Sequence, residues 1–185
     1  MKKNTNYANR GMGFETLIEE TNMQYFMKKI ATIQKIATPI KIIKTEKTLN
    51  AFFETEKTLN AFFEKKSTVD FIGCYNGRAI AFDAKSTRER TRFPLSNIED
   101  HQFEFLKRWQ DNGGISFILV EFAKKNEVYI LPFDELEAWW NEAENGGRKS
   151  IKYEWFVENC ELVKSKNGIL LDYLNAIEKV KKSEK

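Results

Sequence analysis

The sequence predicts a mixed α/β domain built around one sheet. A helical stripe near the start of the chain is followed by short apolar runs, then by further helical patterns and another dense apolar run. Two of the runs are joined by Asn76-Gly77, the strongest short signal for a β-hairpin. This order of helices and strands is typical of a sheet covered by helices.

Composition supports one domain with a full hydrophobic core. The chain has 185 residues, of which 42% are hydrophobic and 31% charged, as in soluble globular proteins. No apolar run is long enough for a membrane span and no export leader is apparent, so we expect a cytoplasmic location. Cys74 and Cys160 are therefore expected to be free thiols, with a single bridge between them as the alternative.

The first half of the chain predicts a helix, a strand and a hairpin. Residues 39–43 resemble the end of a strand, and residues 69–85 predict a hairpin closed by Asn76-Gly77, since a type I′ turn needs positive φ at both positions. Residues 12–30 predict a helix whose stripe at helical spacing is Phe14, Leu17, Ile18, Thr21 and Tyr25.

A second helix is expected at residues 96–110. Ser96 and Glu99 have the spacing of a capping box at its start. Residues 115–122 follow as a dense apolar strand of the kind that is buried on both faces. The apolar stripe of the helix is Ile98, Phe105, Leu106 and Trp109.

The remaining third of the chain is less regular. Residues 127–131 predict a further strand, and residues 132–140 open another helix with Pro132 near its start. Residues 151–160 fit either a strand or a helix, and the chain is expected to end in a short amphipathic segment.

Basic residues gather in clusters although the net charge is only +3. The segment 85–92 contains four Lys or Arg and one Glu, and further clusters lie at 1–10, 146–150 and 178–185. Clusters beside turns suit phosphate contacts, with a solvated loop surface as the alternative. Because His101 is the single histidine and no phosphate-binding glycine loop or nucleophile elbow appears, any chemistry must rely on carboxylates and lysine.

The predicted hairpin gathers polar side chains on one face. A two-residue turn places Asp70 opposite Asp83 and Thr68 opposite Lys85. Side chains alternate along a strand, so these four project together. A bulge at Gly73 would shift this register. The opposite face is expected to belong to the core and carries Val69, Phe71, Ile80 and Phe82.

This arrangement predicts a phosphodiesterase site. Two opposed carboxylates repel each other unless a cation lies between them, and Mg²⁺ prefers oxygen ligands. Lys85 can stabilise charge on a pentacovalent phosphate or orient an attacking water. Gln102 lies in an apolar helix stripe, where it can reach the metal or simply satisfy a hydrogen bond, and Glu15 is a third acidic candidate or a solvated helix charge. The alternative for the hairpin itself is an exposed Asp–Lys pair on an edge.

At these residues the chain resembles the RecU family of Holliday junction resolvases, which belongs to the PD-(D/E)xK nuclease superfamily. The matching stretches follow the family's order over nearly the whole chain. They are NRGMGFE (9–15), ATPIKII (37–43), STVDF (67–71), AIAFDAKST (79–87), FPLSNIEDHQ (93–102), GGRKSI (146–151) and LDYL (171–174).

The resemblance implies a restriction-endonuclease-like fold, with a central mixed sheet flanked by helices and a protruding stalk. It divides the chain into a flexible basic arm at 1–11, a nuclease domain at 12–178 with the stalk inserted at about 44–66, and a basic tail at 179–185. The implied protein is a cytoplasmic homodimer.

The resemblance also implies a hydrolase that nicks four-way DNA junctions symmetrically in recombination and repair. The implied cofactor is Mg²⁺, with Mn²⁺ as a substitute, and a recombinase or a branch-migration motor is a conceivable partner. A two-fold dimer suits a two-fold junction, and contacts would go to the DNA backbone. The DNA-contacting residues are expected to be Arg10, Arg88, Arg90 and Arg92.

Carried over by position, Lys85 stabilises the transition state and Glu15 matches the first-helix acid of the superfamily. Asp83 stands where similar proteins commonly have glutamate, so its shorter side chain would hold the metal closer to the backbone. The implied metal-site residues are Thr68, Asp70, Asp83 and Gln102.

The stretch TEKTLNAFFE occurs twice, at 45–54 and 55–64. Two short copies are too few for a solenoid. The resemblance places them in the stalk, the second copy in its returning arm and the first in its outgoing arm or tip. A recent duplication that lengthens a tolerant loop is the alternative. Four phenylalanines would be available to stack on unpaired bases: Phe52, Phe53, Phe62 and Phe63.

Two other functions stay open at this point. One is a nuclease of the same superfamily that acts on linear duplex. The other is a junction-binding protein with weak or no cleavage, against which the presence of Asp70, Asp83 and Lys85 argues.

Overall fold

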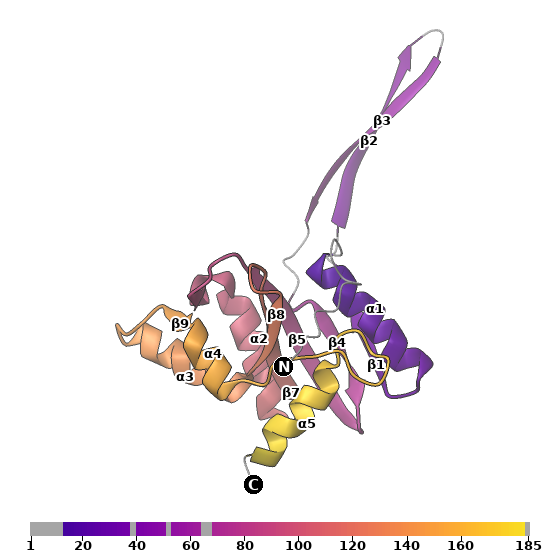
Figure 1. Cartoon of the computed structure of the whole chain (residues 1–185). Coiled ribbons are helices and arrows are strands. Elements are labelled where there is room, and N and C mark those ends of the chain that lie inside the picture. The colour runs from indigo at the N-terminus through magenta and orange to yellow at the C-terminus, as the bar shows by residue number, and fades with distance from the viewer. Residues whose placement is uncertain (1–12, 38–39, 51–52, 64–67, 184–185) are drawn as a thin grey trace.

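The computed structural model describes residues 13–37, 40–50, 53–63 and 68–183 (Figure 1). The predicted basic arm, its Arg10 and the stalk residue Phe52 lie outside these ranges.

Five strands form one central sheet. The strands β5 (Arg78–Thr87) and β7 (Ile115–Phe122) pair in parallel, whereas every other neighbouring pair is antiparallel. A parallel pair needs a crossover, and the chain makes it through a helix between the two strands. The predicted mixed sheet is therefore confirmed. Its strands, in spatial order, are β1 Ala31–Lys35, β4 Phe71–Tyr75, β5 Arg78–Thr87, β7 Ile115–Phe122 and β8 Glu127–Pro132.

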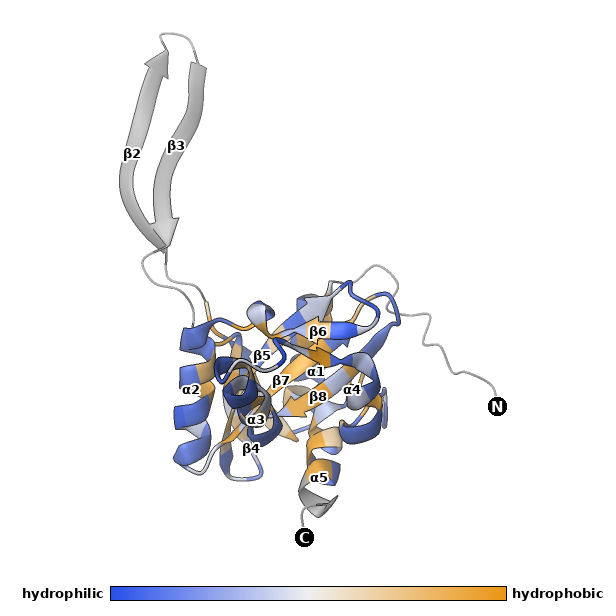
Figure 2. Cartoon of the chain, turned by 90° about the vertical axis from the view of Figure 1, so that its left-hand side faces the viewer, coloured by the Kyte–Doolittle hydropathy of each residue, from blue (hydrophilic) through white to orange (hydrophobic). Residues whose placement is uncertain are grey.

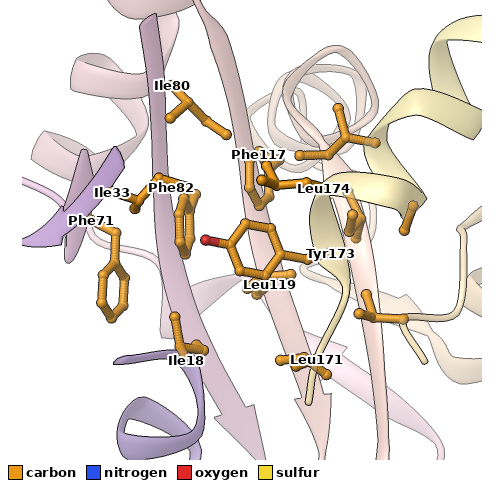
Figure 3. Close-up of a cluster of buried hydrophobic side chains, with 14 of the residues drawn as sticks. Ile18, Ile33, Phe71, Ile80, Phe82, Phe117, Leu119, Leu171, Tyr173 and Leu174 are labelled. Carbon is orange, nitrogen blue, oxygen red and sulfur yellow. The ribbon is translucent and has the colours of Figure 1, made fainter. Parts of the chain in front are cut away.

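Helices cover both faces of this sheet, and each face has its own apolar cluster. One face packs against α1 and α5; Tyr173 of α5 lies among the rings of Phe82 and Phe117 there (Figure 3). Apolar residues concentrate on the strands while the outer helix faces are polar (Figure 2). The helices are α1 Phe14–Met27 and α5 Tyr173–Ser183 on one face, and α2 Asp100–Asp111, α3 Phe133–Glu144 and α4 Tyr153–Asn159 on the other.

The β4–β5 hairpin has the predicted register without a shift. Asn76 and Gly77 adopt φ angles of 50° and 71°, as a type I′ turn requires. The ladder runs regularly from the pair Tyr75–Arg78 to the pair Phe71–Phe82. Gly73 marks no bulge; a Cβ atom there would collide with the backbone of β1, so the glycine permits close strand approach.

Several local predictions were wrong. The segment 39–43 does not end a strand but contains the start of one, and β1 was missed. The second helix begins at Asp100, because Ser96 lies in a separate 3₁₀ turn, and the capping box is formed by Glu99 with Gln102. Val69 is buried on the α2 side of the sheet, away from Phe71. The ambiguous segment near 151–160 contains both a strand, β9 Ser150–Lys152, and the helix α4.

A long antiparallel hairpin projects from the body (Figure 1). Its strands are β2 Ile40–Asn50 and β3 Phe53–Phe63, so it starts before the expected bound of about 44. The register joins Thr45 to Leu59 and Lys47 to Lys57, so the start of the first repeat copy lies across from the second, whereas Asn50 pairs with Phe53 of its own copy. As expected, the second copy lies in the returning strand.

A second small sheet pairs β6 Arg92–Pro94 with β9 in antiparallel orientation. Both cysteines are free, as predicted: Cys74 is exposed and Cys160 half-buried. Among the helices that the structure describes, none is long and apolar enough to cross a membrane.

Candidate active site

Asp70 and Asp83 meet where the β4–β5 ladder ends. The backbone N–H of Asp70 donates to Asp83 Oδ1 at 3.1 Å, and Asp70 Oδ2 accepts the backbone N–H of Ala84 at 2.9 Å. Each carboxylate is thus fixed by the backbone of the opposite strand. This places the two carboxylates opposite each other, as the hairpin register predicted.

Lys85 joins the same group of side chains. Its Nζ lies 2.6 Å from Asp83 Oδ2, and its side chain is 19% exposed, whereas that of Asp83 is fully buried. The alternative of an exposed Asp–Lys pair on an edge is therefore wrong. β5 is a central strand, and α2 packs over the face that carries Asp83.

The electrostatics of Asp83 are those of a buried acid beside a second acid. The pKa of Asp83 is raised to about 7, chiefly by burial and also by the hydrogen bond and the charge of Asp70, while the Lys85 ammonium opposes this shift. In this environment a nearby positive charge stabilises the ionised form of the carboxylate. Strongly perturbed pKa values of this kind are common at functional sites.

Gln102 ties the start of α2 to the carboxylates. Its Nε2 donates to Asp83 Oδ1 at 3.2 Å, while its Oε1 accepts the backbone N–H of Glu99 at 3.1 Å. A backbone N–H can only donate, so the amide oxygen must face Glu99 and the amide nitrogen must face Asp83. The structure therefore shows Gln102 as a hydrogen-bond donor to Asp83, and its role as a metal ligand stays a prediction.

Thr68 precedes β4 and is exposed. Its hydroxyl makes no hydrogen bond to another described residue, so its predicted metal role rests on its position in the sequence alone. Its expected place across from Lys85 lies beyond the last pair of the ladder, which joins Phe71 to Phe82.

Glu15 lies in the first turn of α1, bound to a residue that the sequence had not indicated. Its carboxylate contacts Lys35 Nζ at 2.7 Å, and Lys35 also contacts Glu19 at 2.8 Å. These two carboxylates raise the pKa of Lys35. Lys35 ends β1 beside the site, since the next N–H, that of Ile36, donates to Asp70 O at 2.8 Å. Because β1 was missed in the sequence, this lysine was missed with it.

The described residues hold no group of three or more His, Cys, Asp or Glu side chains placed to bind one metal ion. Glu15 therefore does not join Asp70 and Asp83 in a common cluster. The donors that converge are the two carboxylates, which are hard oxygen ligands of the kind Mg²⁺ prefers, and Mg²⁺ commonly uses only one or two carboxylates.

The predicted DNA contacts remain predictions. Arg88, Arg90 and Arg92 are exposed on the segment that follows the strand carrying Asp83 and Lys85. The stalk phenylalanines Phe53, Phe62 and Phe63 belong to β3.

In the absence of divalent cations, Asp83→Asn should raise the unfolding temperature, and the gain should grow as the pH rises from 4 to 8. The pKa of this carboxyl is about 7 when folded and 3.8 as a model value, so the folded state binds more protons between these values. The free energy of unfolding of the parent protein therefore falls as the pH rises between these two pKa values, whereas asparagine does not titrate and avoids this loss. Thermal unfolding of both proteins at each pH measures the gain. A gain that is constant or shrinks with pH would contradict the buried charge.

Comparison with known proteins shows the family of the chain. The model of the Recombination protein U (RecU) family matches residues 9–179. Holliday junction resolvase RecU of Pediococcus pentosaceus is 37% identical over 174 residues, which cover 94% of this chain and 85% of that protein. The proteins of the same name from Bacillus cytotoxicus and Bacillus thuringiensis are each 36% identical over 180 residues, covering 97% of this chain and 88% of theirs. With the paired carboxylates and the adjacent lysine in place on the sheet, the chain belongs to the RecU family.

Proposed function

We propose that this protein is a structure-specific endonuclease that resolves four-way DNA junctions by hydrolysing one phosphodiester bond in each of two strands. The observation that carries the proposal is the buried Asp83 beside the half-buried Asp70, with the Lys85 ammonium against Asp83, in a chain whose relatives are named Holliday junction resolvases. Its place of action would be the cytoplasm.

The chemistry follows from the charges of the site. In-line attack of water on a phosphodiester produces a pentacovalent phosphorus with extra negative charge, and the Lys85 ammonium would stabilise that charge. Asp83 holds the ammonium at 2.6 Å, and Gln102 holds Asp83. Mg²⁺, or Mn²⁺ in its place, would bind Asp70 and Asp83, with Thr68 and Gln102 as further expected ligands, and would supply charge neutralisation and an activated water.

We further propose that the active form is a homodimer. A four-way junction contains pairs of strands related by a two-fold axis, and a symmetric dimer would present two identical sites at a fixed separation. Each protomer would then cut one strand of a related pair. The β2–β3 hairpin would reach toward the open centre of the junction.

One assay tests the proposal. The protein is incubated with a labelled mobile four-way junction and with a matched linear duplex, each with and without Mg²⁺. Paired symmetric nicks in the junction, dependent on the metal and absent from the duplex, are the expected result. Equal cutting of linear duplex would identify a different nuclease activity, and tight junction binding without cutting in Mg²⁺ or Mn²⁺ would identify a binding protein.

A further inference from the structure

The β6–β9 sheet brings together two basic segments that lie far apart in the sequence. Its register pairs Arg92 with Lys152, Phe93 with Ile151 and Pro94 with Ser150. Phe93 and Ile151 are fully buried in the cluster under α2, α3 and α4. The alternate residues must therefore face outward, because side chains alternate along a strand.

This outward face places two cations directly opposite each other. Arg92 and Lys152 are both exposed, and like charges at opposed positions of an antiparallel pair destabilise it. The face borders an open hollow of about 440 Å³, which we call the β6–β9 hollow. Its lining contains three cations, two hydroxyl groups and a single acid: Arg92, Arg148, Lys152, Thr91, Ser150 and Glu154.

We propose that the β6–β9 hollow binds the sugar–phosphate backbone of one duplex arm of the DNA substrate. Guanidinium, ammonium and hydroxyl groups are the usual donors to phosphate oxygens. A phosphate in the hollow would relieve the repulsion between Arg92 and Lys152. Contacts to phosphate and sugar position a protein on the duplex without reading its bases, so the proposed contact is independent of base sequence.

The position of the hollow supports this occupant. β5 carries Asp83 and Lys85, and the segment that leaves it carries Arg88 and Arg90 before it enters β6. Basic residues therefore follow the chain from the candidate active site to the hollow, to which Arg148 and, from β9, Lys152 are added. The inference rests on the proposed function, since it names a second place where the same substrate is held.

The test is the double substitution Arg148→Gln with Lys152→Gln in the full chain. Both side chains are exposed, so the fold should be retained, which thermal unfolding checks. Binding of a fluorescent four-way junction without Mg²⁺ should weaken roughly tenfold near physiological salt. The slope of log binding constant against log salt should become less steep by about 2, because two phosphate contacts are lost.

The matched control is Lys164→Gln with Lys166→Gln, which removes the same charge from the exposed segment before α5, on the other side of the sheet. It should leave the salt slope close to that of the parent. Glu154→Gln removes the acid of the hollow and should tighten junction binding several-fold at low salt.

The proposal is overturned if the hollow variant and the control variant bind alike, or if the loss depends on the base sequence of the arms. Both readouts are binding measurements made without metal. A parent protein that binds junctions but never cuts them would therefore refute the proposed function while leaving the hollow fully testable.

Discussion

Asp70→Asn and Asp83→Asn should each lower junction cleavage by roughly a thousandfold or more, with junction binding retained. Each change removes the negative charge from one of two carboxylates that converge on the same space. The asparagine oxygen can still accept the backbone N–H that the carboxylate accepts, so the hairpin should fold normally. Single-turnover cleavage of a labelled junction measures the effect, and a gel-shift assay without Mg²⁺ measures binding.

Two further variants sharpen this experiment. Lys85→Ala should abolish cleavage as well, because it removes the ammonium that lies 2.6 Å from Asp83. Asp111→Asn is the matched control, since this carboxylate is 58% exposed on α2 and contacts Lys107, one turn away, at 3.8 Å. Its cleavage rate should equal that of the parent. Undiminished cleavage by both Asp70→Asn and Lys85→Ala would place the active site elsewhere.

Phe82→Ala should lower the free energy of unfolding by about 3–5 kcal/mol. The fully buried ring of Phe82 stacks between Phe71 and Phe117, with centroids 4.9 and 4.8 Å away, and Tyr173 of α5 packs against it at 5.1 Å (Figure 3). Alanine would leave a cavity between three strands and a helix, and close packing prevents the neighbours from filling it.

Urea unfolding followed by circular dichroism measures this loss as a shift of the midpoint at constant m-value. The control is Phe26→Ala, because this ring on α1 is 58% exposed and its removal should change the free energy by less than about 0.5 kcal/mol. An equal loss in the two variants would mean that the ring stack around Phe82 does not stabilise the sheet.

Local patterns were reliable where one signal decided the structure. The Asn76-Gly77 pair set the turn, and the turn then determined which residues of β4 and β5 face each other. The turn alone therefore predicted that Asp70 lies opposite Asp83. The dense apolar run at 115–122 likewise indicated a strand buried on both faces, because few other structures bury so many consecutive side chains.

Short elements escaped prediction because their stability comes from distant partners. β1 has only five residues and is defined by its pairing with β4, which also explains why Lys35 and its contact with Glu15 were missed. β6 and β9 have three residues each; β6 was not predicted, and the segment that contains most of β9 fitted either a strand or a helix. Their pairing creates the β6–β9 hollow, which no inspection of either segment alone would have shown.

The start of α2 illustrates the same limit within the site. The sequence predicted a capping box of Ser96 with Glu99, whereas the structure forms it from Glu99 and Gln102. In this arrangement the Gln102 side chain both closes the cap and donates to the carboxylate of the buried Asp83. That second partner lies on another element, so local spacing around the helix start does not reveal it.

By itself, the sequence determined which side chains of the candidate site lie opposite each other, since alternation along a strand and the geometry of a two-residue turn act over a few bonds. Only the tertiary structure decided the charge state of these side chains and the hydrogen bonds that hold them. The raised pKa of Asp83 comes from burial beneath α2, and the orientation of the Gln102 amide comes from a cap on that helix. Desolvation depends on what covers a side chain, and that is fixed by the packing of the whole domain.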